Sequence, residues 1–278
     1  MVVPPTFSDL GKAAKDVFNK GFSIGSNKLT VKTKTASGIS LSPSFEMKND
    51  ALVAAFETSG SPSEGFTLKE KWTSENVTKT NLIVEDKICK GLKLDLEVVV
   101  NAASGKKTAT AKTAYKTDCF NGTFDANLEL AGPTLVSTAV GEYSGIQGGV
   151  EVAFDTEKSK LTKNSIAVGY TQNDYSFVGF VKDLSLFEGL LHHKVNGDTE
   201  IAASMSWNNQ SNACTYNFGA KHTLDSATAL RMKMDATGKT TLSVTHKIKP
   251  WLEATFSNQV NAKTLTGMSP GISLEANL

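Results

Sequence analysis

Beyond residue 25, most of this sequence alternates between apolar and polar side chains, and the clearest case is the segment from Gly91 to Val100. Leucine and valine occupy every second position there, and Lys93, Asp95 and Glu97 lie between them. A period of two residues is typical of a β-strand whose two faces meet different surroundings. Repeated units of ~10 residues, each followed by a turn signal, are typical of a transmembrane β-barrel. A soluble β-barrel or sandwich that buries its apolar faces is the alternative that this pattern leaves open.

The repeated pattern predicts a single all-β domain over residues 26–278, preceded by a helical segment and a glycine hinge in residues 1–25. Counting these units gives about nineteen strands, at roughly 13 residues each with the turn included, and this density suits a barrel of ~10-residue spans better than a pair of sandwiches. Ser59-Gly60-Ser61-Pro62 predicts a turn after the strand that begins at Ala51. Asn81 to Glu85 predicts a short strand, and Phe120 to Leu130 a longer one.

Charge balance, cysteine spacing and the lack of a long apolar run argue against several classes of protein. Lys+Arg number 29 against 28 Asp+Glu, so no basic excess indicates a nucleic-acid partner. Cys89, Cys119 and Cys214 are too widely spaced for a disulfide framework or a zinc site. No apolar run approaches the ~18 residues of a membrane-spanning helix, and the N-terminus shows no cleavable targeting pattern. We expect no cofactor and no metal ion.

The first 21 residues are the one segment with a helical period. Apolar residues recur at i, i+3, i+4, i+7 and i+8, namely Leu10, Ala13, Ala14, Val17 and Phe18. The polar face comprises Lys12, Lys15, Asp16, Asn19 and Lys20. Thr6 and Asp9 resemble a capping box, and Gly21 ends the helix. Either this helix only plugs the barrel or lies on a membrane surface, or it lines the pore and moves on a hinge at Gly21 and Gly25.

Glu70 is placed unusually for a charged residue. The alternation puts it on the same strand face as Phe66, Leu68 and Trp72, while Lys69 and Lys71 lie on the opposite face. An ionised carboxylate is costly in the hydrocarbon region of a bilayer, so a lipid-facing glutamate is protonated, close to an interface, or functional. A slip of one residue in register would instead turn Glu70 inward. We predict the outward position.

No arrangement of residues indicates catalysis, and we expect that the protein is not an enzyme. The four histidines lack a carboxylate or cysteine partner at a useful spacing, and no phosphate-binding loop or nucleophile elbow is present. Lysines on inward positions predict a polar interior that attracts anions, the alternative being that they only solvate a wet face. These lysines are Lys12, Lys15, Lys20, Lys32, Lys34, Lys93, Lys112 and Lys116.

Several motifs resemble one known family over essentially the whole chain. They are Val3-Pro4-Pro5-Thr6, Asp9-Leu10-Gly11-Lys12, Lys15-Asp16-Val17-Phe18, Lys20-Gly21, Glu70-Lys71-Trp72, Val84-Glu85-Asp86, Lys90-Gly91-Leu92-Lys93-Leu94, Gly105-Lys106-Lys107, Ala131-Gly132-Pro133, Ala167-Val168-Gly169-Tyr170 and Lys249-Pro250. In these motifs the chain resembles the mitochondrial voltage-dependent anion channels, or eukaryotic porins, and the animal members more than the fungal or plant ones.

The resemblance implies a nineteen-stranded barrel of the mitochondrial outer membrane, with parallel first and last strands and the N-terminal helix inside the pore. It implies a voltage-gated, weakly anion-selective diffusion pore for ATP, ADP, phosphate and other small metabolites. A protein-import pore of the same fold and a soluble β-barrel binding module are the rival hypotheses.

The resemblance also implies roles for individual residues. From the resemblance, nucleotides and anions are expected at Lys12, Lys20, Gly91, Leu92 and Lys93; Lys112 and Lys116 join this group because they are lysines on inward positions. Dinucleotide contacts are expected at Leu242, Ser243, Val244, Ser257, Asn258, Gln259, Val260 and Asn261. The gating helix and its hinge would comprise Lys12, Lys15, Asp16, Lys20, Gly21 and Gly25. Glu70 matches a lipid-facing glutamate that some members link to hexokinase docking and to homo-oligomers.

Overall fold

The computed structural model describes residues 3–129, 132–264 and 266–278. In these residues a single 3-10 turn, Phe7–Asp9, and the helix α1, Lys12–Asn19, precede nineteen strands. The strands are β1 (Ser26–Lys34), β2 (Ser40–Lys48), β3 (Ala51–Ser63), β4 (Phe66–Thr73), β5 (Val77–Glu85), β6 (Leu92–Asn101), β7 (Lys107–Lys116), β8 (Phe120–Asn127), β9 (Thr134–Tyr143), β10 (Ile146–Asp155), β11 (Lys160–Gln172), β12 (Tyr175–Lys182), β13 (Leu186–Lys194), β14 (Thr199–Asn208), β15 (Ala213–Thr223), β16 (Thr228–Asp235), β17 (Lys239–Lys249), β18 (Leu252–Asn261) and β19 (Thr266–Asn277).

Neither of the two short helical segments among the described residues has the length or the apolar character needed to span a membrane.

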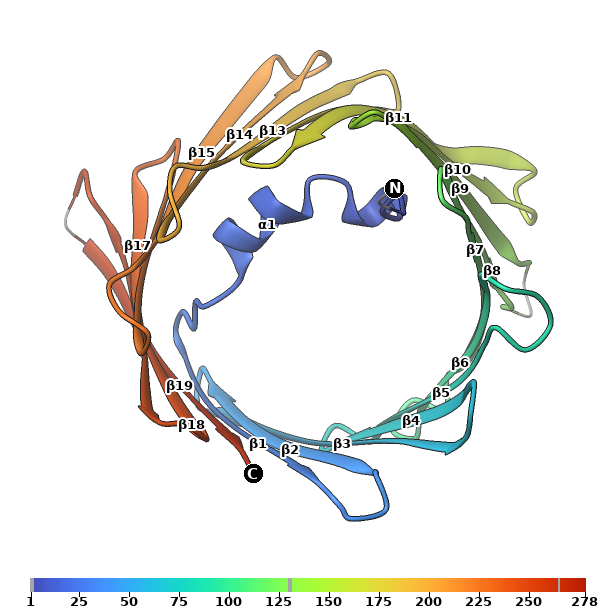
Figure 1. Cartoon of the computed structure of the whole chain (residues 1–278), viewed down its shortest axis with the longest axis horizontal. Helices are drawn as coiled ribbons and strands as arrows, with labels where there is room; N and C mark the ends of the chain where they lie inside the picture. Colours follow the sequence, from blue (N-terminus) through green and yellow to red (C-terminus); the bar gives the residue numbers. More distant parts are fainter. Residues whose placement is uncertain (1–2, 130–131, 265) are drawn as a thin grey trace.

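The strands form one closed barrel (Figure 1). Each strand pairs antiparallel with its neighbour in sequence, and β1 pairs parallel with β19, with Leu29 opposite Leu274. An odd number of strands that alternate in direction leaves the first and the last pointing the same way, so the closing pair must be parallel. The expected strand number and the parallel closure are confirmed.

The outer face of the barrel is apolar in its middle. Leucine and aromatic side chains stand on it with nearly half of their surface exposed, for example Phe45 at 45% and Leu96 at 43%. Register keeps such residues together, since Leu29 lies opposite Phe45 and Leu82 opposite Leu96. A soluble barrel would bury so wide a band of apolar side chains, whereas a bilayer covers it. The fold is that of a membrane-embedded barrel.

Some segments differ from the predicted boundaries. Strand β3 continues through Ser59–Pro62 to Ser63, because a bulge at this point accommodates the proline, which has no N–H to donate. Strand β5 begins at Val77, four residues before the predicted start. Strand β8 ends at Asn127, and Leu130, the predicted end, lies outside the described residues.

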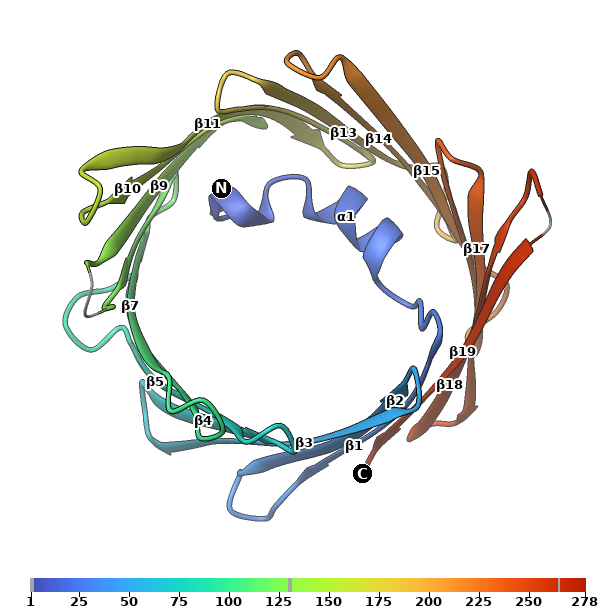
Figure 2. The same cartoon turned by 180° about the vertical axis from the view of Figure 1, so that it is seen from behind.

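The N-terminal segment is inside the barrel, along one side of the wall (Figures 1 and 2). It is not one helix, because Gly11 adopts a left-handed conformation with φ of 67° and separates the 3-10 turn from α1. Thr6 donates its hydroxyl to Asp9 Oδ2 at 3.1 Å and forms no side-chain cap on the backbone. The predicted capping box is therefore replaced by a side-chain contact.

Candidate functional site: the barrel interior

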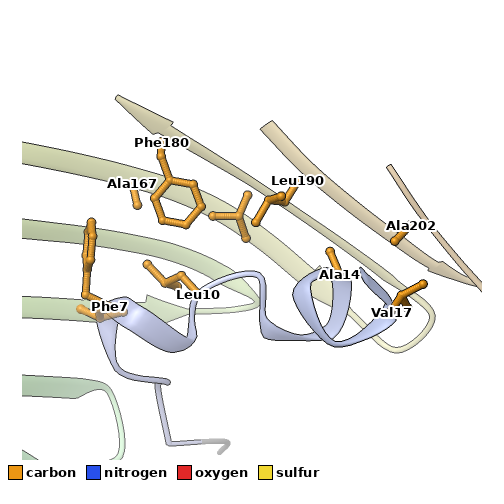
Figure 3. Packing of buried hydrophobic residues seen from close by; sticks show 10 residues of the cluster. Phe7, Leu10, Ala14, Val17, Ala167, Phe180, Leu190 and Ala202 are labelled. Carbon is orange, nitrogen blue, oxygen red and sulfur yellow. The ribbon is translucent and has the colours of Figure 1, made fainter. Parts of the chain in front are cut away.

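Apolar packing holds the N-terminal segment against the wall (Figure 3). The buried cluster comprises Phe7, Leu10, Ala14 and Val17 from the segment and Val140, Ala167, Val178, Phe180, Leu190 and Ala202 from the wall. Close approach depends on glycines of the wall: a Cβ at Gly149 would lie 3.2 Å from Leu10 Cδ1, and one at Gly219 would lie 3.0 Å from Val17 Cγ1. Gly11 itself lies against Leu190. The left-handed turn at Gly11 thus lets both halves of the segment follow the curved wall.

Two lysines, one on α1 and one on the wall, add polar contacts to this packing. Lys15 Nζ donates to the Ser8 carbonyl at 3.0 Å and lies 5.3 Å from the centre of the Phe180 ring. Lys233, on β16, donates to the carbonyl of Phe18 at 2.9 Å, which is one of the free carbonyls at the helix C-terminus. Burial lowers the pKa of Lys15, although nearby Glu188 acts in the opposite direction.

The remaining helix lysines are in local ion pairs. Lys12 Nζ lies 3.0 Å from Asp9 Oδ1, and Lys20 Nζ lies 2.7 Å from Asp16 Oδ2. Burial alone would raise the pKa of Asp9, but hydrogen bonds from Lys12 and Thr6 outweigh it and hold that pKa below its ordinary value. Exposed pairs of this kind contribute only ~0–1 kcal/mol, so both lysines can exchange their partner for a passing anion.

The second predicted group of anion-binding residues lies on β6 and β7. Lys93 and Lys112 point inward and line a cavity of about 350 Å³ together with Thr6 and Ser8 of the N-terminal segment. Lys112 pairs with Glu97 at 2.9 Å. Lys116 also points inward, and its Nζ lies 3.3 Å from Glu85 Oε1. Within the part of the chain that the structure describes, Lys93 has no carboxylate at ion-pair distance.

Gly91 and Leu92 of the same motif do not present a side chain to the barrel interior. Gly91 adopts φ of 87° in the turn before β6, and its N–H donates to Asp86 Oδ1 at 2.6 Å. Leu92 alternates with Lys93 and so faces outward at the start of the strand. Only Lys93 of the predicted Gly-Leu-Lys motif therefore presents a charged side chain to the interior.

The predicted dinucleotide contacts divide between the two faces of β17 and β18. Leu242, Val244, Asn258 and Val260 share the outer face, and Leu242 is 55% exposed there. Ser243, Ser257, Gln259 and Asn261 share the inner face. Ser243 and Ser257 are almost fully buried and bind the linker that follows α1. These eight residues thus do not form one surface that a molecule in the interior can contact.

Glu70 occupies the predicted outer position. It lies opposite Thr58 on β3 and Thr80 on β5. At the next outward position of β4, Trp72 stacks on Phe56, with the ring centres 5.7 Å apart. The adjacent Lys71 points inward, toward Glu57 at 4.0 Å. Glu70 is remote in sheet order from the strands that hold α1.

The wall residues that hold the segment are not among the predicted site residues. Lys233 and Arg231 lie on alternate positions of β16, which is the signal that places both inward, but nothing in the sequence indicates that they contact residues 18–22. Lys233, Lys15, Asn217 and Gln259 line a polar cavity of about 490 Å³ between α1 and the wall.

Comparison with known proteins extends over the whole barrel. The family model described as eukaryotic porin matches residues 3–270. A protein of Meleagris gallopavo named non-selective voltage-gated ion channel VDAC2 is 36% identical over 280 residues, covering 99% of this chain and 95% of that protein. The Homo sapiens protein of that name is 35% identical over the same shares. The Xenopus laevis protein of that name is 36% identical over 98% of this chain and 99% of its own length.

A solved structure of a double mutant of Rh. blastica porin has a TM-score of 0.48 and 10% identity over 90% of this chain and 96% of its own. This similarity is too low to bear on function.

Proposed function

The chain belongs to the eukaryotic porin family, and from this membership we propose that it is a voltage-gated, weakly anion-selective diffusion pore of the mitochondrial outer membrane. Both the family and the barrel indicate a membrane-embedded channel rather than an enzyme. Barrels of 16–18 strands enclose an aqueous channel, and a nineteen-stranded barrel is at least as wide. Such a channel admits solutes of the size of ATP, ADP and phosphate.

The distribution of charge over the inner face carries the proposed anion preference. On the inward positions of the strands, lysine and arginine outnumber aspartate and glutamate. Among the described residues, inward lysines without a carboxylate at ion-pair distance include Lys28, Lys34, Lys69, Lys93 and Lys239, so the positive charge is not fully neutralised. Fixed positive charge along a wide wet channel favours anions by electrostatics. The VDAC2 relatives are named non-selective, so we expect a small preference.

The same charge pattern argues against the protein-import hypothesis. A channel for positively charged leader peptides is expected to carry acidic and apolar tracks along its wall. The inner faces of β6 and β7 carry the lysines Lys93, Lys112 and Lys116 against the two acidic residues Asp95 and Glu97, and Glu97 lies in an ion pair with Lys112. This arrangement suits small anions.

A planar bilayer experiment tests the proposal. The purified chain, inserted in a bilayer under a salt gradient, is expected to give large conductance steps that close at both polarities and a reversal potential that favours anions. Replacing Lys12 and Lys20 by glutamate should move that potential toward cations, because both side chains are exposed in the interior. Lys107→Glu, on the outer face at the end of β7, is the matched control. Absence of conductance would refute the pore, and an unchanged reversal potential in the helix variant would refute the role of the helix charges.

A further inference from the structure

The linker between α1 and β1, residues 20–25, is fixed rather than free. Its glycines, Gly21 and Gly25, predict a flexible hinge, yet Ser23 is only 7% exposed. The two wall serines that contact the linker, Ser243 on β17 and Ser257 on β18, are 2% and 5% exposed. Since the two serines lie opposite each other in register, they form one polar spot on the inner wall.

Three hydrogen bonds connect this spot to the linker in a ring. The Ser23 N–H donates to Ser257 Oγ at 3.0 Å, the Ser257 hydroxyl donates to Ser243 Oγ at 3.0 Å, and the Ser243 hydroxyl donates to the Gly21 carbonyl at 2.6 Å. A backbone N–H can only donate and a carbonyl can only accept, so the direction of every bond in the ring is determined. Each hydroxyl therefore donates once and accepts once, and buried bonds arranged head to tail reinforce one another.

Backbone fit supports the same conclusion. A Cβ at Gly271, on β19, would overlap the Ser23 carbonyl, so the linker lies directly on the sheet at that point. A Cβ at Gly21 would lie 2.5 Å from Arg231 Nε, and φ at Gly21 is 74°. Gly21 thus permits close packing and a left-handed turn. Gly25, in contrast, has only Ser269 Cβ near it, at 3.9 Å.

A second attachment lies just before the ring. Lys233 donates to the Phe18 carbonyl, and its ammonium group lies 4.4 Å from the centre of the Phe22 ring. Phe22 is the residue that the serine ring encloses, between Gly21 and Ser23. The wall therefore holds the chain from Phe18, near the end of α1, to Ser23.

We propose that Ser243 and Ser257 are positioning residues that clamp Gly21–Ser23 to the wall, so that a voltage-driven displacement of the N-terminal segment must first break the serine ring. This proposal rests on the proposed function, because it assigns the clamp a part in gating. It also gives Ser243 and Ser257 a task within the chain that differs from dinucleotide binding.

Hydrogen–deuterium exchange tests whether the ring holds the linker. The full-length protein in lipid nanodiscs is compared with Ser243→Ala, Ser257→Ala and the control Ser165→Ala. Ser165 is fully buried on the inner face of β11, and its hydroxyl has no hydrogen-bond partner among the described residues. Ser243→Ala and Ser257→Ala each remove two of the three bonds, but only Ser257→Ala removes the acceptor of the Ser23 N–H, so in that variant exchange of the Ser23 amide should accelerate about ten-fold or more. Ser243→Ala leaves the Ser23 bond in place and should have a smaller effect. Unchanged exchange in Ser257→Ala would overturn the clamp.

Bilayer recordings of the same variants test the part in gating. The ring belongs to the state in which the segment is docked, so its loss should move the half-closure voltage toward zero in both Ser257→Ala and Ser243→Ala, each of which removes two of the three bonds, with no change in Ser165→Ala. Faster exchange combined with unaltered gating would refute the gating role while the pore assignment stands. A wild-type protein that does not conduct would overturn the proposed function, and the exchange data would still decide whether the ring holds the linker.

Discussion

Leu10→Ala should release the N-terminal segment from the wall. Leu10 is 1% exposed and packs among Phe7, Gly149 and the wall residues of the buried cluster. Truncating a buried leucine to alanine costs about 2–5 kcal/mol. The site borders a water-filled interior, so water can occupy the space, and we expect the lower part of this range, about 2–3 kcal/mol. At ~1.4 kcal/mol for each factor of ten, the undocked population should rise about 30- to 150-fold.

Hydrogen–deuterium exchange of the α1 amides measures this population directly. An isolated helix of eight residues is unstable in water, so α1 should lose its protection whenever it leaves the wall. Leu96→Ala is the matched control, because Leu96 stands on the outer face of β6, 43% exposed, and touches no part of the segment. If α1 kept its wild-type protection in Leu10→Ala, apolar packing would not be what docks the segment. The lysine attachments and the serine ring would then have to hold it alone.

Two further substitutions address the outer wall and the rim. Glu70→Gln should leave the open-channel conductance unchanged, because Glu70 faces outward. The same substitution should alter chemical cross-linking between copies or the binding of hexokinase. A large fall in conductance would place the side chain inside. Gly91→Ala should lower the refolding yield, because Gly91 has φ of 87° and a Cβ there would overlap the Lys116 carbonyl. The control, Gly105→Ala, lies in a turn with open space around it and should refold better. Equal yields of the two variants would contradict this expectation.

Local chemistry sufficed to predict the wall of the barrel. Alternation placed Glu70 outward and Lys93, Lys112 and Lys116 inward, as the register shows, because a strand sends successive side chains to opposite faces whatever lies next to it. The turn predicted at Ser59–Pro62 is wrong, because a bulge keeps these turn-forming residues within β3. Turn propensity is weak, and the pairing of Gly60 and Ser63 with β4 overrides it.

The interior depended on contacts between distant parts of the chain. Residue spacing alone predicts an amphipathic N-terminal segment, about nineteen two-faced strands and a group of lysines on inward positions. Only the tertiary structure reveals that the segment breaks at Gly11, that its 3-10 turn lies against β9 and β10 and α1 against β13 to β15, and that Gly21 and Ser23 are bound by Ser243 and Ser257. More than two hundred residues separate these partners along the chain. Only closure of the barrel brings them together, so no local pattern could reveal that the expected hinge is clamped.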